Sequence, residues 1–156
     1  MNKQCFNVVA ALSMLALVVV AGCARDDTNE GLELASLDAM PQEVQHAPQG
    51  VQESYQFALA NPEILQRLPC YCGCGGMGHT SNYSCYASSL PGGEVQFDGH
   101  ALGCSICVDI TLDAMRMLKE GRALAEIRTY VDVEYSKYGP SNMPPPETDV
   151  GSDAGD

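Results

Sequence analysis

Three cysteines alternate with single residues in the run from Cys70 to Cys74, which follows Pro69 and precedes a pair of glycines. The side chains of a Cys-x-Cys pair are too close and too poorly aimed to bridge one another without strain. Thiols at this spacing make a good chelate for a soft metal, because Cu(I), Zn(II) and iron–sulfur clusters select thiolate ligands. The glycines at positions 73, 75 and 76 allow the backbone to turn closely around a bound centre. The array therefore predicts either a metal centre or cross-links to distant cysteines.

The first residues have the order of a signal peptide. Lys3 precedes a short apolar run over residues 8–20, and Ala21-Gly22-Cys23 follow. The run is too short and too poorly flanked for a permanent membrane span. The small residues before Cys23 resemble a bacterial lipobox, which implies cleavage after residue 22 and lipid on Cys23. We therefore predict a signal peptide over residues 1–22 and a lipid anchor on the extracytoplasmic side of a bacterial membrane. An ordinary secretory peptide is the alternative.

The remaining chain divides by composition. Residues 23–50 are polar and acidic without a lasting apolar period, which predicts a flexible tether. Three prolines then lead into an acidic tail over residues 147–156, for which we predict disorder. One small domain is left, over residues 51–146. A domain of this size buries little core and usually needs disulfides, a metal or a partner to be stable.

Charge and cysteine content restrict the function further. Twenty acidic and eight basic residues give a formal net charge of −12, which excludes nucleic acid as a partner because phosphate binding needs a basic surface. Of the eight cysteines, Cys5 lies in the signal peptide and Cys23 is assigned to lipid. In an exported protein an even number of cysteines normally indicates disulfides. The six cysteines of the domain are Cys70, Cys72, Cys74, Cys85, Cys104 and Cys107.

The periodicity of the domain predicts a mostly α fold. Apolar residues at helical spacing predict a short N-terminal helix over residues 51–60 and two helices over 104–120 and 124–138. We expect the last two to pack as an antiparallel hairpin. Asn61 and Pro62 have the order of an N-cap and a first helical residue, so a further short helix is expected there. The residues from Cys70 to Gly103 are rich in glycine and serine and predict a long loop over the helices.

A second group of candidate ligands lies where the helix after the loop begins. Cys104-Ser105-Ile106-Cys107 places two thiols at a helix N-terminus, which favours thiolate. A thioredoxin-like redox site would need a βαβ context, and c-type haem attachment would need histidine at position 108. His79 and His100 flank the cysteines and are candidate imidazole ligands. Cys85 is open as a ligand or a disulfide partner. We find no Ser/His/Asp set, phosphate loop or converging carboxylate pair, and therefore do not predict an enzyme.

The same residues resemble the bacterial lipoprotein family named for its PCYCGC motif. The resemblance covers the predicted domain and implies a lipid-anchored exported protein, without an established biochemical activity. It rests on Pro69-Cys70-Tyr71-Cys72-Gly73-Cys74, Gly78-His79, Ser81-Asn82, Gly103-Cys104-x-x-Cys107 and Tyr138-Gly139-Pro140.

Three hypotheses follow for the function. The first is a metal-binding lipoprotein for copper(I), with zinc next, that serves sequestration or delivery to a metal-accepting membrane protein. The second is a structural or binding module held by disulfides, with no metal. The third is a thiol–disulfide oxidoreductase at Cys104 and Cys107. The predicted metal ligands are Cys70, Cys72, Cys74, Cys104, Cys107, His79 and His100.

Overall fold

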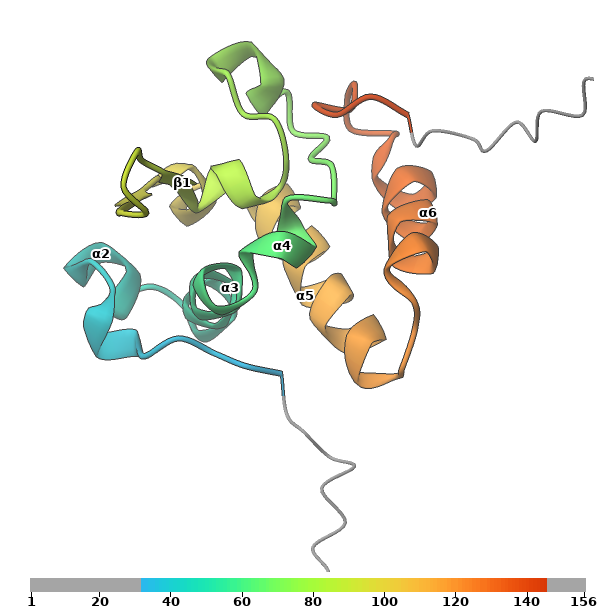
Figure 1. Cartoon of the computed structure of the whole chain (residues 1–156). Coiled ribbons are helices and arrows are strands. Elements are labelled where there is room, and N and C mark those ends of the chain that lie inside the picture. The colour runs from blue at the N-terminus through green and yellow to red at the C-terminus, as the bar shows by residue number, and fades with distance from the viewer. Residues whose placement is uncertain (1–31, 146–156) are drawn as a thin grey trace, which may run out of the picture. The chain divides into compact units, whose positions relative to one another are not determined.

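The computed structural model describes residues 32–145 of the chain. The predicted signal peptide, Cys23 and the predicted tail over residues 147–156 therefore lie outside the described residues. The helices are α2 (Gln42–Gln45), α3 (Gln49–Ala60), α4 (Pro62–Leu65), α5 (Ser105–Lys119) and α6 (Leu124–Tyr135). Helices thus dominate the described part, as predicted (Figure 1).

The core forms where α3 and α6 each pack against α5. Helix α3 buries Tyr55, Phe57 and Ala58, and α6 buries Ile127 and Val131. Between them α5 buries residues at helical spacing, because its apolar face repeats every three to four positions. These are Cys107, Ile110, Ala114 and Met117, so the first buried turn of α5 already carries a cysteine.

The local sequence explains where α5 ends and α6 begins. Gly121 adopts a φ of 75° directly after the helix, a conformation that glycine reaches without steric cost. Four residues connect α5 to α6. The last of them is Ala123, whose backbone N–H donates to Glu126 Oε2 at 3.0 Å. Since α5 and α6 are joined by so short a connection, they lie side by side (Figure 1).

The folded region begins earlier than the predicted domain boundary at residue 51. Residues 32–50, predicted as part of a flexible tether, instead form a short 3-10 helix (Leu37–Ala39), α2 and the start of α3. Met40 and Val44 are buried in the core, and the backbone N–H of Ala35 donates to the carbonyl of Gln56 at 3.0 Å. The prediction was wrong here because Pro41 and Pro48 interrupt the stretch before an apolar period can persist.

Asn61 helps to fasten this N-terminal segment. We expected its side chain to cap α4, but Asn61 Nδ2 instead donates to the carbonyls of Glu33 at 2.8 Å and Phe57 at 3.0 Å. Pro62 does begin α4, as predicted. The asparagine therefore joins the end of α3 to the chain before the first helix.

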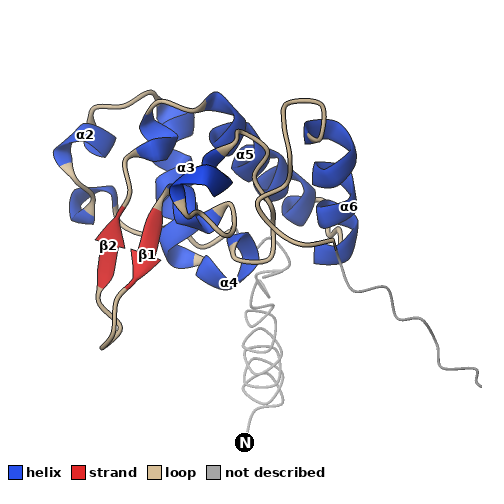
Figure 2. Ribbon diagram, turned by 90° about the horizontal axis from the view of Figure 1, so that it is seen from above, coloured by secondary structure: helices blue, strands red, loops and turns tan. Residues whose placement is uncertain are grey.

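The segment from Cys70 to Gly103 contains no α-helix, but it is more structured than a loop. It includes 3-10 helices at Cys74–Met77, Tyr83–Cys85 and His100–Leu102 and an antiparallel pair of strands, β1 (Ala87–Ser89) and β2 (Val95–Phe97). The strands pair Ala87 with Phe97 and Ser89 with Val95, and Gly92 and Gly93 turn the chain between them at positive φ. The hairpin lies at the edge of the helical body (Figure 2).

Among the described residues, none of the helices has the length and apolar character needed to span a membrane.

Candidate metal centre

Four short segments bring the cysteines of the domain together beside the N-terminus of α5. The array contributes Cys70, Cys72 and Cys74, and the 3-10 helix Tyr83–Cys85 contributes Cys85. His100 comes from the last 3-10 helix before α5. Cys104 occupies the N-cap position of α5 and Cys107 lies in its first turn.

Local backbone geometry explains how the array folds inward. Pro69 follows the turn after α4 and is fully buried, so the chain enters the core immediately before Cys70. Gly73 adopts a φ of 83°, which turns the chain between Cys72 and Cys74. As a result Cys70 and Cys74 are both buried, whereas Cys72 between them is partly exposed.

The sulfur atoms are close but not bonded. Cys70 Sγ lies 3.3 Å from Cys107 Sγ and 3.4 Å from Cys72 Sγ, and Cys72 Sγ lies 3.6 Å from Cys107 Sγ. The sulfurs of Cys74 and Cys85 are 3.7 Å apart. All six cysteines are free thiols.

These separations suit soft-metal coordination. Ligands at a Zn–S distance of about 2.3 Å in a tetrahedron are themselves about 3.8 Å apart, close to the observed sulfur separations. Six thiols and an imidazole form a soft donor set, which suits soft metals better than the oxygen-preferring Ca²⁺ or Mg²⁺. The cluster could therefore hold a metal ion.

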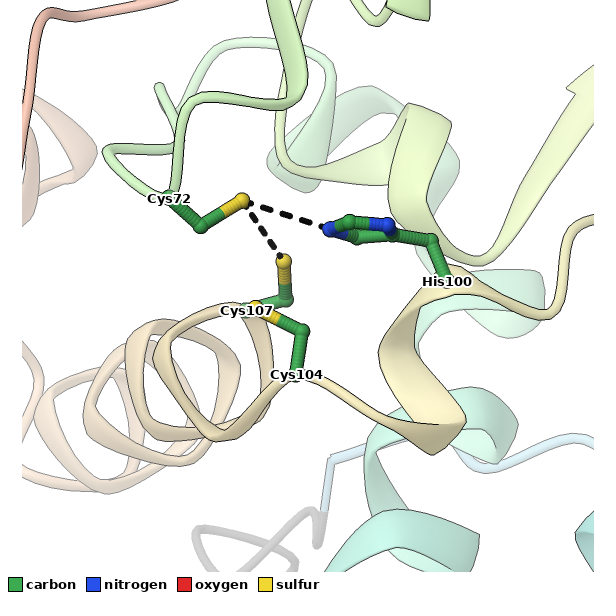
Figure 3. Close-up of side chains that lie close together, drawn as sticks. All are labelled: Cys72, His100, Cys104 and Cys107. Carbon is green, nitrogen blue, oxygen red and sulfur yellow. Dashed lines mark hydrogen bonds between the residues drawn. The ribbon is translucent and has the colours of Figure 1, made fainter.

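One group of four donors lies at the edge of the cluster. The ligand atoms of Cys72, His100, Cys104 and Cys107 lie within 4.8 Å of one another. Figure 3 shows Cys72 from the array facing His100 and the two cysteines of α5, with Cys72 Sγ 3.3 Å from His100 Nε2. Three of these residues are partly exposed and only Cys107 is fully buried, so this is the most exposed of the donor groups.

The remaining thiols form deeper groups. Cys70, Cys85 and Cys107 lie within 4.8 Å of one another and are all buried. Cys70, Cys72 and Cys74 form another such group, and Cys74, Cys85 and His100 a further one. Because members recur between groups, the donors form one continuous cluster.

His79 lies next to the cluster but outside these donor groups. Its Nε2 is 3.4 Å from Asp98 Oδ2, and its ring meets that of His100 edge-on, with centroids 5.2 Å apart. Its Nδ1 is buried and makes no hydrogen bond. Asp98 also accepts a hydrogen bond from the backbone N–H of His100 at 2.8 Å on Oδ1, so one carboxylate positions both histidines.

Burial and proximity change the acidity of the thiols. Hydrogen bonds from the thiols of Cys107 and Cys85 hold the pKa of Cys70 far below its ordinary value. The hydrogen bonds to Cys70 and Cys85, followed by burial, raise the pKa of Cys107. Burial and the neighbouring charge of Cys70 also raise the pKa of Cys72 and Cys74. The thiols therefore influence one another's ionisation, and a bound cation would favour the thiolate form.

A buried polar network holds the backbone carbonyl of Cys107. The carbonyl of Cys107 accepts hydrogen bonds from Tyr86 OH at 2.9 Å and from Asn82 Nδ2 at 3.2 Å. Thr111, one turn further along α5, donates to Asn82 Oδ1 at 2.8 Å. The side chains of Asn82, Tyr86 and Thr111 are fully buried, so this network sets the position of the helix start relative to the loop.

The chain after α6 supports the array from the other side. Asn142 Oδ1 accepts from the backbone N–H of Cys70, and Asn142 Nδ2 lies 3.6 Å from Cys74 Sγ. Tyr71 OH donates to Asp132 at 2.6 Å, and Arg128 bonds both oxygens of the same carboxylate at 3.1 Å. Helix α6 and the segment that follows it therefore hold the array in place.

Residues 12–148 match a protein-family model, which is described as a protein of unknown function with a PCYCGC motif. The chain belongs to this family. The resemblance expected from the sequence is therefore confirmed, and the motif that gives the PCYCGC family its name is here the part of the cluster formed by Cys70, Cys72 and Cys74. Neither the curated proteins nor the solved structures include a significant match.

In this PCYCGC protein six of the seven predicted ligands fall within the donor groups, and His79 does not. The additional donor is Cys85. The sequence did not decide whether Cys85 is a ligand or a disulfide partner, because its loop shows no periodicity. Asn82 was named only as part of the family resemblance, and Asn142 was not identified at all. An asparagine beside a proline run normally indicates a turn, so its sequence context carries no signal of a role at the cluster.

Proposed function

We propose that this protein is a lipid-anchored, extracytoplasmic metal-binding protein that holds Cu(I), with Zn(II) as the next candidate. The observation that carries the proposal is the convergence of six free thiols and His100 Nε2 within one cluster. The lipid anchor rests on the sequence before Cys23 alone. Sequestration of copper, or its delivery to a membrane protein, would suit such a site.

The chemistry of the donors favours Cu(I). Thiolate is the ligand that Cu(I) selects most strongly, and the cluster offers more thiols than a single structural zinc ion requires. A site enclosed by buried sulfur also shields bound copper from solvent. The partly exposed group around Cys72 and Cys104 leaves one side open for transfer to an acceptor.

The alternatives receive less support. A module held by disulfides would have bonded sulfurs, whereas the cysteines of the described residues are free thiols. A thioredoxin-like oxidoreductase would need a βαβ unit, and the sheet of the described residues is only the hairpin of β1 and β2. Metal binding therefore accounts best for the cluster.

Titration of the reduced full chain with Cu(I), read by native mass spectrometry, tests the proposal. We expect bound copper with loss of thiol protons, because thiolates are the ligands. Cys72→Ser and Cys104→Ser should each weaken binding, since each removes a donor of the most exposed group. A chain that binds no soft metal, or that is isolated with three disulfides and is unchanged by reduction and metal, would contradict the proposal.

Two histidine substitutions provide a matched comparison. His100→Ala removes a donor 3.3 Å from Cys72 Sγ and should lower Cu(I) affinity. His46→Ala changes an exposed histidine that bonds only the carbonyl of Gln42 and should leave the affinity unchanged. Equal effects of both would indicate non-specific binding to imidazole.

A further inference from the structure

We infer that the cluster is a two-ion site in which the thiolate of Cys107 bridges an outer and an inner metal ion. The inference rests on the proposed function, since it concerns the same cluster. It extends that proposal from a metal-binding site to a defined number of ions with a shared ligand.

The first argument is the number of donors. A tetrahedral ion takes four ligands, but the cluster has six thiols and one imidazole nitrogen in mutual proximity. One ion would leave three donors unused, and most of those would be buried thiols. Two four-coordinate positions that share one thiolate use all seven donors and leave none unpaired.

The outer position is formed by Cys72, His100, Cys104 and Cys107. These four atoms are the largest group that lies within 4.8 Å. Figure 3 shows the donors arranged around a common space, from the array on one side and from α5 and the preceding turn on the other. This position is partly open to solvent, because Cys72, His100 and Cys104 are only partly buried.

The inner position is formed by Cys70, Cys85 and Cys107, with Cys74 as the fourth donor. The first three are mutually within 4.8 Å, and Cys74 Sγ lies 3.7 Å from Cys85 Sγ. Each of the four is at most 1 % exposed. Four buried thiols without an ion would lack strong hydrogen-bond partners, because a thiol is a weak donor and acceptor.

Cys107 is the donor that belongs to both positions. Its sulfur is 3.3 Å from that of Cys70 in the inner set and 3.6 Å from that of Cys72 in the outer set. Its carbonyl is held by Asn82 and Tyr86, so its place at the helix start is fixed before any ion binds. A thiolate has enough lone pairs to bind two ions at once.

Two divalent ions can balance most of the charge of six thiolates. Two divalent ions displace the protons of six thiols, and the resulting complex carries a net charge of only about −2. With one divalent ion, either buried thiolates remain uncompensated or the remaining thiols stay protonated and unliganded. Cu(I) carries half that charge, so the same balance would require about four copper ions, and the count of two applies to divalent ions.

Cadmium titration of the reduced full chain tests the inference. Native mass spectrometry should count two Cd(II) ions per chain, with the loss of six thiol protons. The NMR spectrum of ¹¹³Cd should show two signals that are coupled to each other through the bridging sulfur. One bound ion, or two ions without coupling, would overturn the shared site, whereas no bound ion would overturn the proposed function itself.

Substitutions separate the two positions. Cys85→Ser should reduce the count from two ions to one and keep the signal of the outer, imidazole-bound ion. Cys104→Ser should also leave one ion, now the inner one, and it changes a partly exposed residue if Cys85→Ser fails to fold. His46→Ala should retain two ions. Retention of two coupled ions in Cys107→Ser would overturn the assignment of the bridge.

Discussion

Asn142 Oδ1 accepts a hydrogen bond from the backbone N–H of Cys70 at 2.7 Å, across 72 positions of the chain. The backbone N–H of Asn142 donates in return to the carbonyl of Cys70 at 3.1 Å. The side-chain Nδ2 of Asn142 also lies 3.6 Å from Cys74 Sγ and donates to the carbonyl of Ser81 at 3.2 Å. One asparagine thus fixes two cysteines of the array and the loop behind them.

Asn142→Ala should therefore weaken metal binding without removing a ligand. Residues that orient metal ligands typically change affinity by about 10–100-fold when replaced, and we expect a loss in this range. Competition with a coloured Cu(I) chelator would measure it. Ser136→Ala is the control, because Ser136 is exposed after α6 and bonds the carbonyl of Val133, and it should leave the affinity unchanged. Wild-type affinity in Asn142→Ala would show that the asparagine does not orient the array.

Gly139 makes the close approach that brings Asn142 to the array. A Cβ atom at Gly139 would lie 2.8 Å from the carbonyl oxygen of Tyr71, which is backbone and cannot move aside easily. Gly139→Ala should destabilise the fold by about 1–3 kcal/mol, as other overpacking substitutions do. Chemical unfolding would measure this.

Gly76→Ala is the matched control for that substitution. A Cβ there meets no atom within 4 Å, and Gly76 does not adopt positive φ. Its unfolding midpoint should match that of the wild type within experimental error. Equal destabilisation by the two substitutions would argue against the close contact with Tyr71.

Thr111→Val tests the polar network beneath Cys107. The substitution keeps the shape of the side chain but leaves Asn82 Oδ1 without its donor at 2.8 Å. A buried polar group without a partner costs about 1–3 kcal/mol, which we expect as the loss in unfolding free energy. Thr129→Val removes an exposed hydroxyl bonded only to the carbonyl of Ala125 and should have little effect. If both variants are equally stable, the network does not hold the helix start.

Cys23→Ala tests the predicted lipid anchor. The small residues before Cys23 indicate a site of lipid attachment, so the substituted protein should be released from membranes or fail to mature. Fractionation of cells that express the full chain would show this. A variant that is processed normally and remains bound to the membrane would contradict the lipid anchor.

The helices could be predicted because their apolar residues are periodic. Ile110, Ala114 and Met117 in α5 and Ile127 and Val131 in α6 repeat at helical spacing, and all five are buried. The start of the fold could not be predicted in the same way. Met40 and Val44 lie in a stretch interrupted by Pro41 and Pro48, and their contact with the core reveals that the segment is folded.

The cluster was predicted in composition but not in arrangement. Close spacing marked Cys70, Cys72, Cys74, Cys104 and Cys107 as candidate ligands. Cys85 lies alone in the sequence, and it reaches the cluster only because the 3-10 helix Tyr83–Cys85 places it 3.7 Å from Cys74. Its role depends on tertiary structure, which spacing does not encode.

The contact between Cys70 and Asn142 has a consequence for the order of biogenesis. The chain is synthesised from its N-terminus, at about 5–20 residues per second, so the array emerges seconds before Cys107 and Asn142 exist. During that interval Cys70, Cys72 and Cys74 have neither their partners on α5 nor the asparagine that orients them. The site is therefore complete only when nearly the whole domain is present, and a chain that ends before residue 142 would lack the asparagine that orients the array.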